Sequence, residues 1–144
     1  MGKINSNYNL TKLKIIPNNN GPIYHGINKN DLDFKGFGEL YFSKIDYKAI
    51  KAWKYHTKQT CNFLVPIGEV LFVTISDEKN SIYNSIKIGE KNYCRLSIPP
   101  STWFGFMGLG KDINLITNLS DFVHNPSETI NKDLEYFDFD WSQF

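Results

Sequence analysis

The sequence has little arginine, little cysteine and no long apolar run. Its 144 residues include 16 basic residues, of which only Arg95 is an arginine, and 15 acidic residues, so the formal net charge is +1. Because charges of both signs are scattered along the chain, nothing indicates binding to nucleic acid or to a membrane surface. No apolar stretch approaches the roughly 20 residues that a helix needs to span a bilayer.

The two cysteines, Cys61 and Cys94, both lie in segments that the residue pattern predicts as strands. The N-terminal segment has no apolar core of the kind found in secretion signals. We therefore expect reduced thiols in the protein interior and a cytoplasmic location, because structural disulfides belong to oxidising compartments.

Short segments rich in β-branched and aromatic residues recur along the chain, separated by turn residues. Such a pattern, with about nine or ten segments and few helical windows, predicts an all-β sandwich or barrel. We expect one domain over residues 1–144. A polar, Asn-rich arm covers about residues 1–22, and an acidic tail with aromatic side chains covers about residues 121–144.

The segment from Ala49 to Ile75 has the densest group of polar side chains within a strongly apolar region. Since a strand alternates its faces, Lys54 and His56 should project to the same side. Lys51 should point away from them unless a β-bulge intervenes. That shared face is either solvated or lines a pocket. Tyr41, on the preceding predicted strand, and His25 are further groups able to carry a proton.

Arg95 is a candidate phosphate ligand, because a guanidinium offers a bidentate fork that lysine lacks. The alternative is an ordinary surface arginine. Trp103 would suit a nucleotide base at a pocket mouth, although tryptophan is more often a core residue. With Lys51 and Asn62 these residues form the expected substrate-binding set.

Three segments and one further residue together resemble one known family. They are Ile50–His56 with Gln59, Val65–Val70, and Leu96–Phe106 with its Ile-Pro-Pro and Gly-Phe elements. Their order and spacing are similar to the cupin-fold dTDP-4-dehydrorhamnose 3,5-epimerases and the related dTDP-sugar 3,4-ketoisomerases, from about Gly38 to Trp141. The resemblance implies a cupin-type β jelly roll, a homodimer, and a nucleoside-diphosphate 4-keto-6-deoxy sugar bound inside the barrel. The product would serve surface polysaccharide synthesis, such as that of lipopolysaccharide.

In that family a base removes a proton beside the ketone, and positioned donors hold the resulting enolate. No metal or redox cofactor is implied, because the ketone itself accepts the electron pair. The resemblance places the family's base histidine at Lys54, a second histidine at His56, and an enolate-binding lysine at Cys61. We therefore expect His56 to be the base and Lys54 the cation beside the enolate, with Tyr41 or His25 returning the proton.

Two functions follow from this pattern. The first is a sugar-nucleotide epimerase or ketoisomerase, which the retained Lys54 and His56 favour. The second is a non-catalytic cupin that binds a sugar nucleotide or a partner enzyme, favoured by Cys61 and by Phe104, which replaces another family histidine. A metal-dependent cupin is not expected, because such a site needs three or four converging ligands.

Overall fold

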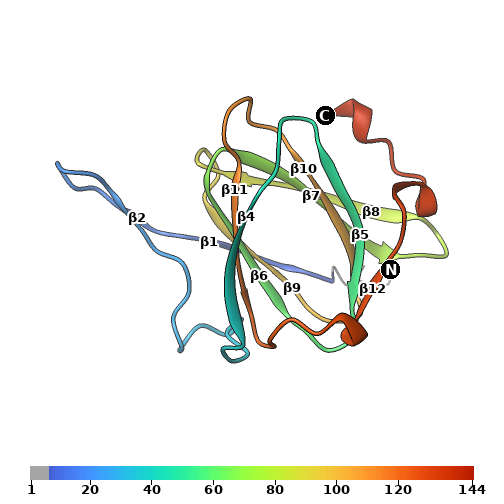
Figure 1. Ribbon diagram of the computed structural model, residues 1–144. Helices are drawn as coiled ribbons and strands as arrows, with labels where there is room; N and C mark the ends of the chain where they lie inside the picture. Colours follow the sequence, from blue (N-terminus) through green and yellow to red (C-terminus); the bar gives the residue numbers. More distant parts are fainter. Residues whose placement is uncertain (1–6) are drawn as a thin grey trace, which may run out of the picture.

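The computed structural model describes residues 7–144, so the first six residues of the expected N-terminal arm lie outside the described part. Two five-stranded antiparallel sheets face each other (Figure 1). The first sheet consists, in spatial order, of β1 (Asn9–Lys12), β9 (Cys94–Ile98), β6 (Cys61–Ile67), β11 (Leu115–Ser120) and β4 (Glu39–Lys44). The second consists of β12 (Thr129–Asn131), β5 (Ile50–His56), β10 (Trp103–Gly108), β7 (Glu69–Asp77) and β8 (Ile82–Gly89). This arrangement confirms the expected jelly roll.

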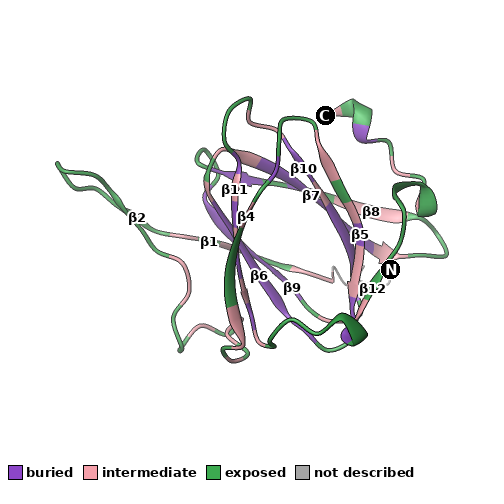
Figure 2. Ribbon diagram, in the orientation of Figure 1, coloured by how far each residue is buried: buried purple, intermediate pink, exposed green. Residues whose placement is uncertain are grey.

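The core lies between the inner faces of the two sheets, where alternating apolar side chains meet (Figure 2). The residue pattern of the strands predicts burial of Ile67, Val70, Phe72, Val73, Leu96 and Ile98, and all of these except Ile67 are buried. The expectation for Ile67 is wrong, because 44% of this side chain is exposed. At this point Gly68, with φ +84°, turns the chain from the first sheet into the second.

The acidic tail covers the outer face of the second sheet, as the aromatic residues predict. Trp141 is buried in a second apolar cluster with Trp53 and Trp103. Phe137 packs edge-on against both Trp53 and Trp103, with ring centroids 5.3 and 5.5 Å apart. Three short 3-10 helices lie in the C-terminal part: η1 (Pro126–Glu128), η2 (Leu134–Tyr136) and η3 (Trp141–Gln143).

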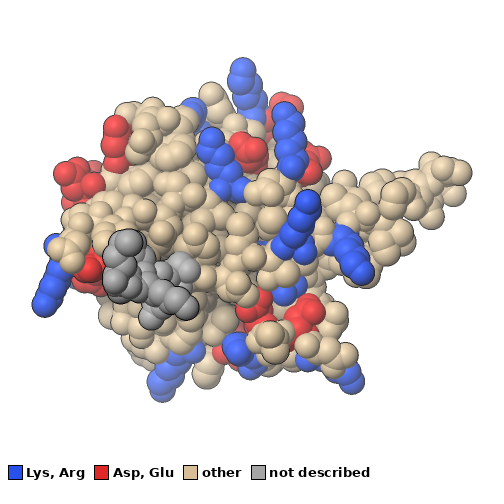
Figure 3. Space-filling model, turned by 180° about the vertical axis from the view of Figure 1, so that it is seen from behind, with Lys and Arg blue, Asp and Glu red and all other residues tan. Residues whose placement is uncertain are grey.

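A two-stranded hairpin of β2 (Ile15–Ile16) and β3 (Ile23–Tyr24) projects from the body (Figure 1). The apolar residues 13–16 and 23–27 each predict a short strand; β2 confirms the first, whereas β3 ends at Tyr24, before His25. Sequence reasoning missed β1, a polar edge strand that pairs with β9. In Figure 3 the projecting hairpin shows no charged side chain at its tip.

Both cysteines are buried free thiols. Within residues 7–144 no helix is long and apolar enough to cross a membrane.

Candidate active site

The polar side chains of β5 share the inner face because the strand contains a β-bulge. Lys54 pairs with Phe104 of β10 and Lys51 with Phe106, while the register shifts between these pairs. Both phenylalanines pack in the inner core, and cross-strand partners share a face. The extra residue in the bulge places Lys51 on the same side as Lys54, which a regular strand would not do. The expected common orientation of Lys54 and His56 is thus present in the fold.

A cavity of about 360 Å³ lies at the edge of the barrel between β4 and β5. Three of the four expected catalytic residues line it: Tyr41, Lys54 and His56. The remaining lining residues are Glu39, Gln59, Ser120 and His124. The cavity therefore places two imidazoles, a phenol and an amine around a space suited to a small polar molecule.

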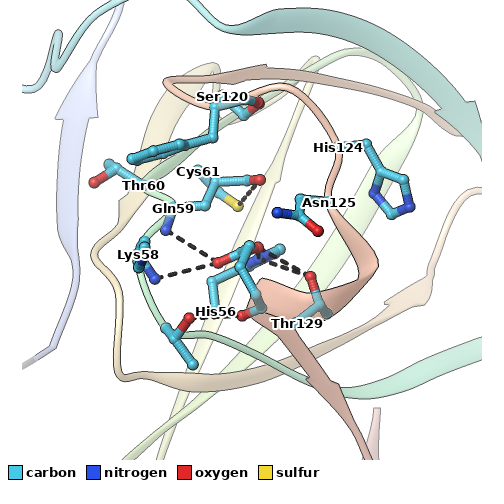
Figure 4. A network of polar contacts seen from close by, with 12 residues as sticks. His56, Lys58, Gln59, Thr60, Cys61, Ser120, His124, Asn125 and Thr129 are labelled. Atoms are coloured by element: carbon cyan, nitrogen blue, oxygen red, sulfur yellow. Dashed lines mark hydrogen bonds and ion pairs between the residues drawn. The ribbon is translucent and has the colours of Figure 1, made fainter.

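His56 is buried, and its Nδ1 is hydrogen-bonded to the buried carboxylate of Glu128 (Figure 4). The Asn125 side chain caps η1 and accepts a hydrogen bond from Ser127 N–H at 3.0 Å, which places Glu128 at the end of that turn. Glu128 Oε2 also accepts bonds from the backbone N–H groups of Lys58 and Gln59, at 3.2 and 3.3 Å. The carboxylate is consequently fixed from several directions.

Burial raises the pKa of Glu128, but the hydrogen bonds from His56, Lys58 and Thr129 outweigh it and hold that pKa at about 2. The carboxylate is therefore ionised and can only accept, so Nδ1 of His56 carries a proton. The other ring nitrogen, Nε2, is left with its lone pair as the available base.

The pKa of His56 is lowered, mainly by burial and to a smaller extent by the charges of Lys54 and His124, while Glu128 acts in the opposite direction. The imidazole is thus neutral near pH 7. The direction agrees with the expectation that Lys54 keeps His56 neutral, although burial contributes more. His56 also lies in a stacked arrangement with Phe104, with ring centroids 6.0 Å apart.

Tyr41 projects from the inner face of β4, and its hydroxyl accepts a hydrogen bond from the Asn118 side chain at 2.8 Å. Burial raises the pKa of this phenol, so it keeps its proton at neutral pH. Cys61, at the start of β6, is buried and also has a raised pKa, about 11, because of burial. Its neutral thiol does not replace the charge of a lysine.

A second cavity of about 270 Å³ adjoins the first and shares Lys54 with it. Lys51 and Lys132 line it together with Lys54, and no acidic residue contributes to its wall. Lys51 donates a hydrogen bond to the carbonyl of Lys44 at the end of β4, a distance of 2.9 Å. Three lysines thus contribute to the wall of this space, an arrangement that favours an anion, while the Lys132 ammonium lies over the Tyr136 ring, 5.1 Å from its centroid.

Arg95, the expected diphosphate contact, lines neither of these two cavities but a third one, of about 410 Å³. It lies on the outer face of the first sheet and is 3% exposed. Its Nη1 donates to Gly26 O at 2.7 Å, and its two Nη atoms form ion pairs with Asp31 and Asp33 at 3.3 Å. Arg95 therefore holds the loop around residues 26–33 against the sheet.

The other expected binding residues are also placed elsewhere. Asn62 lies on the same outer face as Arg95 and donates to Asp33 O at 3.0 Å. Trp103 is buried against Tyr55 under the C-terminal tail. Of the two alternatives for this tryptophan, a core residue or a contact for a nucleotide base, the structure shows the core residue. His25 lines a separate cavity together with Arg95, away from the other expected catalytic residues. In each case an alternating strand or a covering loop turned the side chain away from the barrel.

Sequence reasoning missed Glu128, His124 and Glu39 as site residues. No sequence signal pairs Glu128 with His56, because the two are 72 residues apart. Glu39 could have been found, since the alternation that places Tyr41 inward also places Glu39 inward. Within the described residues, no group of three or more His, Cys, Asp and Glu side chains is arranged to hold a metal ion.

The fold and this cavity define a cupin-type protein with a barrel-edge site. A dTDP sugar isomerase from Desulfovibrio desulfuricans G20 has a similar structure, with a TM-score of 0.86 and 32% identity, covering 94% of this chain and 90% of the isomerase. The QdtA 3,4-ketoisomerase from Thermoanaerobacterium thermosaccharolyticum, in complex with TDP, shares the fold with a TM-score of 0.73, 19% identity and 90% coverage of both chains.

A probable low-salt glycan biosynthesis epimerase, Agl13 of Haloferax volcanii, is 29% identical over 111 residues, which is 71% of each chain. No family model matches the sequence. Because the 32% identity with the isomerase extends over nearly the whole of both chains, the protein belongs to the dTDP-4-dehydrorhamnose 3,5-epimerase-like family of cupin-fold sugar-nucleotide epimerases and isomerases. The resemblance found in the sequence is confirmed.

Proposed function

We propose that this protein, an epimerase or isomerase by its family, moves a proton beside the ketone of a nucleoside-diphosphate 4-keto-6-deoxy sugar, with His56 as the base. The observation that carries the proposal is the His56–Glu128 pair at the wall of the cavity. The ionised carboxylate fixes the tautomer in which Nε2 accepts a proton, and it stabilises the imidazolium that forms.

The reaction begins when His56 Nε2 removes the proton from the carbon next to the ketone. The electron pair of that C–H bond moves toward the ketone, whose oxygen becomes an enolate. Lys54 lines the same cavity and supplies a positive charge for this oxygen. Of the two residues expected to act as the acid, only Tyr41 lines this cavity. Its phenol keeps its proton and can donate a hydrogen bond to the same oxygen.

Lys51 and Lys132 are the residues that we assign to the diphosphate of the nucleotide, in the basic cavity next to Lys54. Flexible lysines supply positive charge without the fixed fork of an arginine, so the contact should be electrostatic and sensitive to salt. Lys51→Met should weaken nucleoside-diphosphate binding, whereas Lys79→Met in the distant loop after β7 should not. Equal affinity in both variants would contradict the assignment.

The test of the reaction uses deuterated water and a panel of dTDP- and GDP-linked 4-keto-6-deoxy sugars. The wild-type protein should incorporate solvent deuterium beside the ketone of at least one of them. His56→Asn should lower the exchange rate by roughly 10²–10⁴-fold, the usual contribution of a positioned base. His25→Asn is the matched control and should retain full activity, since His25 lines a different cavity. Full exchange in His56→Asn would refute the role of His56.

We also propose that two copies associate, with the β2–β3 hairpin and the outer face of β4 in the interface. Ile23 and Tyr24 of the hairpin are 53% and 40% exposed, and Leu40 and Phe42 of β4 are 49% and 61% exposed. Four exposed apolar side chains on the hairpin and on β4 indicate an interaction surface. A second copy of the chain carries the same surface and can bind to it. The mass in analytical ultracentrifugation should be that of a dimer in the wild type and of a monomer in an Ile23→Asp, Phe42→Asp variant. A monomeric wild type would exclude this interface.

The free thiols of Cys61 and Cys94 suit a reducing compartment, and we place the reaction in the cytoplasm.

A further inference from the structure

Asn118 is a polar side chain on the apolar inner face of the first sheet. It lies in β11, where its cross-strand partners are Tyr41 of β4 and Phe63 of β6. The side chain is fully buried, and the core residue Ile116 lies two positions before it on the same face. A buried amide needs hydrogen bonds, because its unpaired polar atoms would cost free energy. The proposed reaction gives this amide no role.

The two hydrogen bonds of Asn118 fix the direction in which its amide points. The backbone N–H of Asn62 donates to Oδ1 at 3.1 Å, and Nδ2 donates to the hydroxyl of Tyr41 at 2.8 Å. A backbone N–H can only donate, so the amide oxygen faces Asn62 and the amide nitrogen faces Tyr41. The reverse orientation would place two donors against each other. The main chain of β6 thus sets the polarity of the contact with Tyr41.

The same polarity decides where the proton of Tyr41 lies. Nδ2 of Asn118 cannot accept a hydrogen bond, so the hydroxyl oxygen accepts and its own O–H points elsewhere. Because the O–H of a phenol prefers the plane of the ring, the proton takes the direction away from the amide. Among residues 7–144 the contact with Asn118 is the only hydrogen bond of this hydroxyl. The phenol lines the cavity of about 360 Å³, and its proton is therefore available to a molecule bound there.

The wall that the first sheet contributes to this cavity depends on Tyr41 for a donor. The strand residues in that wall are Glu39, Tyr41 and Ser120. A carboxylate such as that of Glu39 accepts, and Ser120 donates its hydroxyl proton to Phe122 O at 2.6 Å. Cys61, where the family resemblance places an enolate-binding lysine, is neutral because burial raises the pKa of its thiol to about 11. A hydrogen bond from these strands to an enolate therefore comes from Tyr41.

We propose that Asn118 is a positioning residue, which turns the hydroxyl proton of Tyr41 into the cavity so that it meets the enolate oxygen. The inference rests on the function proposed above and deepens it. Without the amide, the phenol proton is free to rotate toward the sheet, and the oxygen lone pairs would then face the enolate and repel it. The hydrogen bond from Asn118 also lowers the pKa of Tyr41, against the larger effect of burial, and makes the phenol a stronger donor.

Two substitutions at Asn118 test this role. Asn118→Leu is similar in size and removes both hydrogen bonds. Asn118→Asp keeps an acceptor for the N–H of Asn62, so it serves even if Asn118→Leu does not fold. Each substitution is made in the wild type and in Tyr41→Phe. Asn84→Leu, in β8 of the second sheet, is the matched control outside the cavity. Thermal unfolding identifies the variants that remain folded.

The first measurement is solvent-deuterium exchange with the same panel of dTDP- and GDP-linked keto sugars. Asn118→Leu should lower kcat by roughly 10–100-fold, the range for a hydrogen bond to a charged group, with little change in KM. Tyr41→Phe should show a similar loss, and Asn118→Leu should lower kcat no further in that background, because both residues act through one hydrogen bond. Asn84→Leu should keep the wild-type kcat.

The pH dependence of Asn118→Asp tests the direction of the hydrogen bond. The protonated acid can donate to the Tyr41 oxygen as the amide does, whereas the ionised carboxylate only accepts and draws the phenol proton away from the cavity. The loss of kcat, relative to the wild type at the same pH, should therefore grow as the pH rises. Wild-type rates at every pH up to about 9, the upper end for a buried carboxyl group, would overturn the proposal. Equal losses from Asn118→Leu with and without the Tyr41 hydroxyl would also overturn it, because a purely structural amide does not need the phenol.

A second measurement does not depend on turnover. In NMR spectra of protein with isotope-labelled tyrosine, the signal of Tyr41 is the one that Tyr41→Phe lacks. It should titrate at a higher pH in Asn118→Leu than in the wild type, since the lost hydrogen bond lowers that pKa. An unchanged titration would overturn the role of Asn118. A wild type that exchanges no deuterium with any of these sugars would instead refute the proposed function, while a raised titration would still identify Asn118 as the residue that orients the phenol.

Discussion

Two polar contacts, one on the inner side of the second sheet and one on the outer face of the first sheet, differ in what they leave free. His56 is paired with Glu128 through one ring nitrogen, and its other nitrogen belongs to a side chain that lines a cavity. Arg95 is paired with Asp31 and Asp33, and its Nη1 also bonds to Gly26. Its remaining Nε is buried without a hydrogen-bond partner among the described residues. Both side chains line a cavity, so the difference lies in the atom that is left: His56 keeps a ring nitrogen that can accept a proton, whereas the guanidinium of Arg95 can only donate.

The largest effect should come from Glu128→Gln. The amide can donate to Nδ1 of His56, which would move the proton to Nε2 and remove the basic lone pair from the cavity. We expect deuterium exchange to fall by roughly 10²–10⁴-fold, as for loss of a positioned base. Because Glu128 raises the pKa of His56, the residual activity should extend to lower pH. A pH–rate profile shifted to higher pH would contradict this role.

The same substitution should change how stability depends on acid. The pKa of Glu128 is about 2 in the folded protein and 4.5 without its partners, so the folded state binds fewer protons between these values. The ionised carboxylate therefore stabilises the wild type above about pH 4.5, and this contribution is lost as the pH falls through about 2. Urea unfolding measured across this range should show a shallower loss of stability in Glu128→Gln.

The Arg95 pair should behave as a structural element. Arg95→Met leaves the carboxylates of Asp31 and Asp33 without their partner, and we expect a loss of roughly 3 kcal/mol in the free energy of unfolding. This value is at the low end for breaking a buried pair, because both aspartates are partly exposed. Exchange activity per folded molecule should be unchanged. Loss of nucleotide binding with unchanged stability would restore Arg95 to the site.

The comparison also shows what the sequence could and could not predict. Alternation along β5 correctly predicted that Lys54 and His56 project to the same side, because strand faces are a local property, whereas only the fold shows that Tyr41 of β4 lies on the same inner face. For Arg95 the same reasoning was incomplete. Its neighbour Leu96 faces the core, so Arg95 must face outward, but only the tertiary fold shows that a loop covers that face.

Two further features depended on contacts between distant segments. The bulge in β5 that turns Lys51 inward is set by the register with β10, and a single strand pattern does not show such a shift. Glu128 reaches His56 only after the chain has formed β11 and returned through η1. Residue type and spacing therefore singled out His56 as the proposed base, while the carboxylate that orients it comes from elsewhere in the chain.

The smallest effect concerns Lys54, the residue nearest in sequence to the base on its own face. Its charge lowers the pKa of His56, but burial is the larger cause of that lowering. Lys54→Met should therefore raise the pKa of His56 only slightly and move the acid limb of the pH–rate profile upward by a small amount. The rate at the plateau should fall as well, since the enolate loses its cation. The control, Lys79→Met, should leave both the limb and the plateau where they are. If Lys54→Met lowers the plateau without moving the limb, Lys54 acts on the enolate alone, and His56 is kept neutral by burial and not by its neighbour's charge.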